Sequence, residues 1–262
     1  MAGRLNLSKW YADCITDTGD ALILYSAELR WRSHTIHYTG LLTHRPGAPT
    51  RTRVSLRRQA PPQLRDSAVH WHSQPWKMQA EWRDLGDPIH QSLLSTPEGS
   101  LDWHCLAPRS SVEFLLPGTD PIRGWGYVEH LQISIAPWHL PIQQLRWGRF
   151  VNAEDAILWI DWRGPETRQV VYYNGSPTSP AIIADHQIDL PYSTTLTLVP
   201  IATLREGPLG STALAKLPHL DRIFPARILQ VREHKWLSHA TLCRPGRPDS
   251  TGLAIHEVVD WP

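Results

Sequence analysis

Apolar and polar residues alternate with a period of two along most of this chain, which is the pattern of a half-buried β-strand. The clearest run extends from Ala21 to Trp31, where every second residue is apolar. Pro and Gly, with 23 and 16 residues, interrupt such runs at short intervals and predict tight turns. No stretch shows the period of a long amphipathic helix. The pattern therefore predicts an all-β protein built from many antiparallel strands.

The boundaries of the expected elements follow from the same pattern. Besides 21–31, we expect strands over 36–42, 51–57, 67–72, 76–82, 89–95, 101–106, 125–135, 145–151, 156–162, 169–174, 181–188, 194–201, 226–232 and 253–261. Short helical turns are expected near 5–14 and 217–222. The turn-rich segment 117–121 predicts a boundary between a domain over 1–119 and a domain over 120–262. Residues 20–25 resemble 155–160, which is consistent with two related halves.

One carboxylate falls on an apolar face. In the strand expected over 125–135, Glu129 shares a face with Trp125, Tyr127 and Leu131. Burial among such groups favours the protonated carboxyl, unless a cation pairs with it. A neutral carboxyl in an apolar pocket can donate a proton. Glu129 is therefore a candidate catalytic acid.

The second half repeats this arrangement on three further strands. Glu257 and Asp161 alternate into apolar faces, and Arg149 lies on the same face as Trp147. The candidate catalytic residues are Glu129, Asp161, Glu257 and Arg149, and the candidate substrate-binding residues are Trp125, Tyr127, Trp147, Trp159, Trp261 and His130. An alternative for Arg149 is a buried ion pair with a carboxylate that fixes the strand register.

Composition narrows the possible functions. The chain has 13 Trp beside 3 Phe and 7 Tyr, which indicates a ligand platform or pocket wall as well as a core. An ordinary β-barrel core is the alternative explanation. Lys and Arg number 26 against 25 Asp and Glu, so we expect no nucleic-acid partner, because such proteins need a clustered basic excess.

Other classes of site have no support in the sequence. The three cysteines are widely spaced and predict neither a disulfide framework nor a metal site. His70 and His72 share a face without a further ligand at suitable spacing, and no phosphate loop or nucleophile motif occurs. We expect no metal, no cofactor and no stable membrane insertion, since no apolar run approaches the length of a span. The N-terminus lacks a signal-peptide pattern, which favours a cytoplasmic location.

A set of motifs resembles one protein family. It comprises Gly126-Tyr127-x-Glu129-His130, Pro137-Trp138, Leu145-Arg146-Trp147-Gly148-Arg149-Phe150, and Trp159-x-Asp161-Trp162, and the opening Trp10-Tyr11 with Asp17-x-Gly19-Asp20 is similar too. These residues resemble the carotenoid 1,2-hydratase (hydroxyneurosporene synthase)-like family, which also includes fungal Diels–Alderases. The resemblance is loose over both halves and specific over about 124–162.

The resemblance implies two lipocalin-like (calycin-like) antiparallel β-barrels packed side by side, with the candidate site in the C-terminal domain. It also implies cofactor-independent chemistry on an apolar, alkene-bearing isoprenoid or polyene, by acid-assisted hydration, cyclisation or isomerisation. Two alternatives remain. A pericyclase would fold the substrate between aromatic walls, and a carrier would bind a lipid or isoprenoid without converting it. The fold alone does not decide between them.

Overall fold

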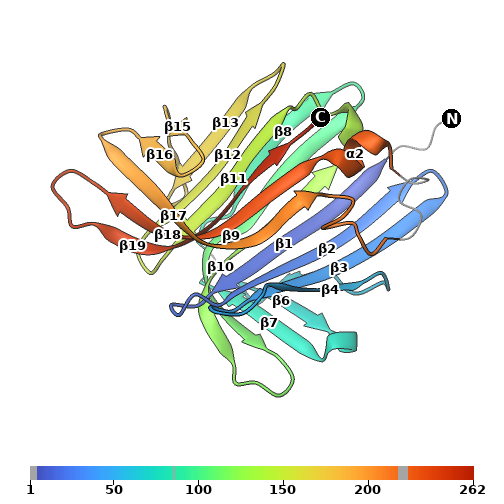
Figure 1. Ribbon diagram of the computed structural model, residues 1–262, viewed down its shortest axis with the longest axis horizontal. Helices are drawn as coiled ribbons and strands as arrows, with labels where there is room; N and C mark the ends of the chain where they lie inside the picture. The colour runs from blue at the N-terminus through green and yellow to red at the C-terminus, as the bar shows by residue number, and fades with distance from the viewer. Residues whose placement is uncertain (1–4, 85, 218–223) are drawn as a thin grey trace. The chain divides into compact units, whose positions relative to one another are not determined.

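The computed structural model describes residues 5–84, 86–217 and 224–262 and is built almost entirely of β-strands (Figure 1). The chain forms two compact units, Met1–Ala136 and Pro137–Pro262. In the described residues, each unit contains one antiparallel sheet, of ten strands in the first and nine in the second. The prediction of an all-β, antiparallel architecture is confirmed.

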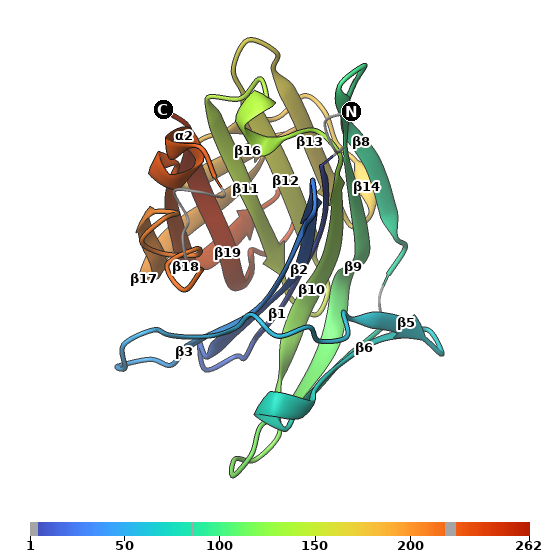
Figure 2. The ribbon, with the colours of Figure 1, turned by 90° about the vertical axis from the view of Figure 1, so that its right-hand side faces the viewer.

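The first unit is a curled sheet in which β1 and β10 lie next to each other near the centre. Its elements are β1 (Asn6–Ile15), β2 (Ala21–Trp31), β3 (His34–His44), β4 (Arg51–Ser55), β5 (Gln63–Arg65), β6 (Ala68–Ser73), a short 3₁₀ helix (Gln74–Trp76), β7 (Met78–Arg83), β8 (Ile89–Thr96), β9 (Gly99–Leu115) and β10 (Ile122–Ile133). The strand order is β4-β3-β2-β1-β10-β9-β7-β6-β5, and β8 pairs with β9. Figure 2 shows β2, β1, β10 and β9 running side by side.

The second unit repeats this plan. Its elements are a 3₁₀ helix (Pro137–His139), β11 (Gln144–Val151), β12 (Ala156–Arg163), β13 (Arg168–Tyr173), β14 (Ser176–Pro177), β15 (Ile182–Ile183), β16 (Gln187–Leu190), β17 (Thr194–Pro208), α2 (Ala226–Gln230), β18 (Arg232–Cys243) and β19 (Ser250–Asp260). The strand order is β14-β13-β12-β11-β19-β18-β17-β16-β15.

The two orders correspond strand by strand, because in each unit the first strand pairs with both the second and the last. β1 pairs with β2 and β10, and β11 pairs with β12 and β19. The similar segments 20–25 and 155–160 both begin at the turn into the second strand. Glu129 lies opposite Tyr11 on the first strand of its unit, and Glu257 lies opposite Trp147 on the first strand of its own. These two acids thus occupy corresponding positions.

An apolar core covers one face of the first sheet and is rich in tryptophan. Its buried members are Ala12, Cys14, Leu22, Leu24, Leu41, Val69, Trp71, Trp76, Met78, Ala80, Trp82, Ala107, Val112, Phe114 and Val128. The Trp82 indole lies over Gly126 of β10, and its Nε1 donates to the Asp13 carbonyl at 2.7 Å. A Cβ on Gly126 would stand 2.2 Å from that same carbonyl oxygen, so the close approach of strand and indole requires a glycine.

A second apolar core covers the corresponding face of the second sheet. It comprises Phe150, Ile157, Trp159, Val171, Ile183, Ile188, Leu190, Leu196, Leu198, Ala240, Leu242 and Ala254. Here Trp159 lies over Gly148, where an added Cβ would stand 2.2 Å from the indole Cζ2. Both units therefore pack a large indole against a glycine on a central strand.

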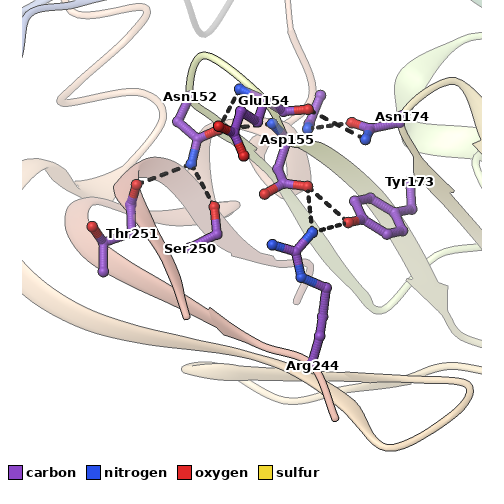
Figure 3. A network of polar contacts seen from close by, with 9 residues as sticks. Asn152, Glu154, Asp155, Tyr173, Asn174, Arg244, Ser250 and Thr251 are labelled. Atoms are coloured by element: carbon purple, nitrogen blue, oxygen red, sulfur yellow. Dashed lines mark hydrogen bonds and ion pairs between the residues drawn. The ribbon is translucent and has the colours of Figure 1, made fainter. Parts of the chain in front are cut away.

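A polar network holds the turns at one end of the second unit (Figure 3). Asp155 accepts hydrogen bonds from Tyr173 at 2.7 Å and from Arg244 at 2.9 Å. Asn152 joins the β11–β12 turn to Ser250 of β19 at 2.9 Å. Burial alone would raise the pKa of Asp155, but hydrogen bonds from Ser250 and Tyr173 and the charge of Arg244 together lower it. The network stabilises the hairpins rather than forming a reactive centre.

Three predicted elements differ in the structure. Residues expected as a helical turn near 5–14 form β1, and residues expected as a strand at 226–232 begin with helix α2. The strand expected over 181–188 is two short strands, β15 and β16, joined by a turn in which the Ala184 N–H donates to the Gln187 carbonyl at 2.9 Å. Most of the turn expected near 217–222 lies outside the described residues.

The predicted domain boundary also falls elsewhere. Residues 117–121 form the turn of the β9–β10 hairpin, and the two units divide after Ala136. Turn-forming residues favour a hairpin and a linker equally, so their composition could not distinguish them. As a result β10, with Glu129, belongs to the first unit, whereas Asp161, Glu257 and Arg149 belong to the second. Among the described residues, no helix is long and apolar enough to cross a membrane.

Candidate functional site

Two tyrosine–carboxylate pairs lie side by side on β1 and β10, on the face of the first sheet opposite its apolar core. The Tyr11 hydroxyl donates to Asp13 Oδ2 at 2.9 Å, and the Tyr127 hydroxyl donates to Glu129 Oε2 at 2.7 Å. The strand register sets Tyr11 opposite Glu129 and Asp13 opposite Tyr127. The four side chains thus form a square. Each tyrosine has one acid two residues away on its own strand and another opposite it on the neighbouring strand, and all four side chains are buried.

Glu129 is held by two neutral donors on a single oxygen. Its Oε2 accepts from Tyr127 and, at 2.7 Å, from the Trp103 indole N–H of β9. The same indole lies 3.2 Å from the Tyr127 hydroxyl oxygen. Because Oε2 is occupied as an acceptor, a proton on this carboxyl would reside on Oε1. The two described hydrogen bonds therefore both hold the carboxyl by its Oε2.

The groups around Glu129 keep their own protons. Burial, together with the nearby Glu129 charge, raises the pKa of Tyr127 well above its usual range. Burial and Glu129 likewise raise the pKa of Cys105, which lies directly across from Glu129 on β9. The phenol and the thiol are thus neutral at ordinary pH, and the phenol acts as a hydrogen-bond donor rather than as a base.

Burial along this face decreases toward one end. Tyr127 is fully buried and Glu129 is 5% exposed, whereas Lys9 and Leu131, the next residues along the two strands, are half-buried. The Lys9 ammonium lies 5.9 Å from the centre of the buried Tyr25 ring. Glu129 thus lies near the end of the face where burial is lower.

The corresponding position in the second unit has a different environment. Glu257 forms an ion pair with Lys235, which also lies 3.7 Å from Glu233. The Lys235 ammonium stands 5.4 Å from the centre of the Trp147 ring. Glu257 is therefore an acceptor in a charged network, whereas the donors described for Glu129 are neutral.

The other candidate catalytic residues lie in different parts of the second unit. Asp161 is buried and accepts from Arg163 at 2.7 Å, and Gln169 approaches its second oxygen at 3.5 Å. Arg149 is completely buried on the same face of β11 as Trp147. The structure thus places Asp161 on the core-side face of its sheet and Arg149 on the opposite face, so these two do not converge.

The candidate substrate-binding residues are also dispersed. Trp159 is part of the second core, and Trp261 packs beside Val259 in a small separate cluster. Trp125 is half-buried on β10. His130 lies on the opposite face of β10 from Glu129, where it stacks on Trp10 with ring centres 4.3 Å apart. Of the predicted aromatic residues, Tyr127 is the one hydrogen-bonded to Glu129.

Sequence reasoning missed three members of the Glu129 environment. Tyr11 and Asp13 lie on β1, which was expected to be partly helical, so their shared face could not be recognised. Trp103 lies in the strand expected over 101–106, but its contact with Glu129 depends on the pairing register of β9 and β10, which a single sequence does not reveal. Among the described residues, no group of three His, Cys, Asp or Glu side chains is arranged to hold a metal ion.

At the level of sequence, no family model and no curated protein matches the chain. The fold, however, is similar to solved structures over almost its full length. CghA matches with a TM-score of 0.60 and 9% identity, covering 97% of this chain and 88% of that protein. Kievitone hydratase from Nectria haematococca matches with a TM-score of 0.56 and 9% identity, covering 98% and 89%.

A candidate AttH protein from Nitrosomonas europaea matches with a TM-score of 0.52 and 11% identity, covering 99% of this chain and 93% of that one. These similarities confirm the lipocalin-like fold expected from the resemblance. At such low identities they establish the fold and leave the chemistry to the site.

Proposed function

We propose that this protein is an enzyme that acts without a cofactor on an apolar, unsaturated small molecule, by adding water to it, cyclising it or isomerising it. Glu129 is the acid in this proposal. The observation that carries it is a buried carboxyl whose Oε2 accepts from Tyr127 and Trp103, which orients the other oxygen, Oε1, as the proton donor.

The chemistry begins with transfer of a proton from Oε1 to one carbon of an alkene. The resulting cation is tertiary when the alkene is trisubstituted, and nearby ring faces stabilise it by roughly 2 kcal/mol each in a dry environment. Tyr11 and Trp103, which lie beside Glu129, take this role in the proposal. Capture by water and loss of a proton give an alcohol. Capture by an internal alkene gives a cyclic cation, which loses a proton to give a ring with a double bond, and direct loss of a neighbouring proton gives an isomer. In each case the released proton restores the acid.

The fold supports this class of function. Kievitone hydratase, which shares the fold, is by its name a hydratase, and CghA has been crystallised with the small molecule Sch210972. A lipocalin-like scaffold is thus compatible with hydration and with small-molecule binding. The alternative of catalysis by substrate folding requires that Glu129 act only as a hydrogen-bonding group.

The test is the turnover of prenylated phenols and linear polyenes, followed by mass spectrometry. Products are detected as a gain of one water, or as isomers with a new retention time. We expect Glu129→Gln to bind substrate normally but to lose turnover by roughly a hundredfold or more, the usual scale for a positioned proton donor. Glu98→Gln, an exposed change in the same unit, is the matched control and should retain turnover.

Three results would contradict the proposal. A loss of less than about tenfold in Glu129→Gln would favour catalysis by substrate folding. A large loss of turnover in Asp161→Asn, with turnover nearly unchanged in Glu129→Gln, would mean that Asp161 of the second unit is the catalytic acid. Tight binding without turnover of any alkene by the wild-type protein would favour a carrier.

A further inference from the structure

A row of four flat rings crosses the core-side face of the first sheet, with one ring on each of four adjacent strands. The rings belong to Trp10 of β1, His130 of β10, His104 of β9 and His90 of β8. Successive centres are 4.3, 6.2 and 4.1 Å apart. The planes of the outer pairs deviate by 12° and 10°, so Trp10 stacks on His130 and His104 stacks on His90, whereas a tilt of 33° separates His130 from His104.

We propose that this row is a binding surface for a planar, conjugated, uncharged molecule with a carbonyl or hydroxyl edge. Stacked rings expose further flat edges and faces for such a ligand. Imidazole nitrogens supply hydrogen-bond donors and acceptors beside those faces. Since His130 and Glu129 point to opposite faces of β10, this surface is separate from the proposed catalytic acid.

The row is accessible, unlike the core beside it. Trp10 packs against the apolar core and is half-buried, His130 and His104 are half-buried, and His90 is exposed. Exposure thus increases from the core outward along the row. A ligand stacked at the exposed end of the row, against His90, would cover apolar ring surface that contacts water.

The imidazoles of His130 and His104 have lowered pKa values, which favours an uncharged ligand. Burial, with a smaller contribution from neighbouring His104, lowers the pKa of His130 to about 4. Burial and then His90 lower the pKa of His104, while Asp102 opposes the shift. Rings that are neutral at pH 7 stack without the cost of desolvating a charge. Ser8 Oγ lies 2.8 Å from His130 Nε2 and holds that ring in place.

A similar combination occurs in the second unit. Trp236 stacks on His234 and His256 with centres 3.9 and 5.0 Å apart, and His186 meets both Trp236 and His256 edge-on. His234 and His104 correspond, since each directly precedes the residue opposite the acid of its unit. The tryptophans do not correspond, because Trp236 lies on the strand equivalent to β9 and Trp10 lies on β1.

A metal is a poor alternative ligand for the row. Face-to-face imidazoles direct their nitrogens sideways, so that the lone pairs do not converge on one point. In agreement, the described residues contain no group of three metal-ligating side chains in a suitable arrangement.

The experiment is a titration of the full-length protein with 7-methoxycoumarin at pH 7.5, observed through the imidazole NMR signals of ¹⁵N-histidine-labelled protein. We expect saturable shifts at His90, His104 and His130. The saturated bicyclic ketone 1-decalone has a carbonyl but no π face, and should bind at least several-fold more weakly. Shifts confined to other histidines, equal binding of the two probes, or no saturable shift would overturn the proposal.

Variants of His104, one of the two inner rings, distinguish a loss of stacking from a loss of folding. His104→Ala should weaken coumarin binding about threefold to tenfold, since one aromatic contact is lost. His104→Phe keeps the flat ring and should restore most of the affinity, and His72→Ala, an exposed change on β6, should have no effect. Circular dichroism confirms that each variant is folded. If His104→Ala binds as tightly as the wild type, the row is not the binding surface.

Discussion

Acidification should destabilise the second unit through a single buried histidine. His256 is 2% exposed, accepts or donates a 2.7 Å hydrogen bond with Ser238 and stacks on Trp236. Burial, followed by the nearby His186, lowers its pKa from 6.5 to about 3, and His234 and Lys235 act in the same direction while Asp185 opposes them. In the folded protein the ring is therefore neutral across most of the pH range in which proteins are studied.

The sign of the effect follows from proton binding. Below pH 6.5 the unfolded chain binds a proton at this residue and the folded chain does not, so the free energy of unfolding falls as the pH falls from 6.5 toward 3. Between pH 8 and pH 5 these two pKa values give a loss of about 2 kcal/mol. The full loss, about 5 kcal/mol, would be reached only below pH 3.

The measurement compares the wild type with His256→Gln, which keeps a hydrogen-bonding group for Ser238 but cannot bind a proton. Urea unfolding at pH 8, 6 and 5, followed by tryptophan fluorescence, gives the stability of each protein. We expect the advantage of the wild type over the variant to shrink by about 2 kcal/mol from pH 8 to pH 5. Other titrating groups, including His130, are present in both proteins, so their contributions to the pH dependence of stability cancel in this difference. Parallel pH curves for the two proteins would refute the reasoning.

Two further changes test packing and charge in the second unit. Gly148→Ala places a Cβ 2.2 Å from Trp159 and should destabilise the protein by about 1–3 kcal/mol in urea unfolding, with partial recovery when Trp159→Leu is added. Full stability in the single variant would contradict the described packing. Lys235→Met leaves the Glu257 carboxylate without its ammonium and should cost about 3 kcal/mol, whereas adding Glu257→Gln should recover much of the loss. No recovery in the double variant would show that the lysine acts elsewhere.

The strands that could be predicted are those in which apolar residues recur at every second position or form an unbroken run. β2 was predicted with its observed bounds, and most of β10 was recognised, because their residues alternate between the two faces. The β1 segment was misassigned because its polar residues Ser8, Lys9 and Asp13 do not alternate regularly with apolar ones. Asp13 was consequently never placed on a face with Glu129.

β18 was missed for the opposite reason. Its buried positions include Glu233 and Lys235, which are charged and therefore resemble a solvent-exposed pattern. These charges compensate one another across neighbouring strands, which only the register reveals. The prediction that acids face apolar surroundings correctly identified Glu129, Asp161 and Glu257 as buried or half-buried, but the cation beside each of the last two could not be foreseen.

Each sheet can be completed only after its final strand has been synthesised. Leu7 pairs with Ile133, and Gln144 pairs with Asp260, so the central pairing in both units joins the earliest and latest strands. Such distant pairings have a high entropic cost of loop closure and slow the folding of β-proteins. During translation the first unit can close while the second is still being made, which separates in time two sheets whose similar strand orders would otherwise invite mispairing.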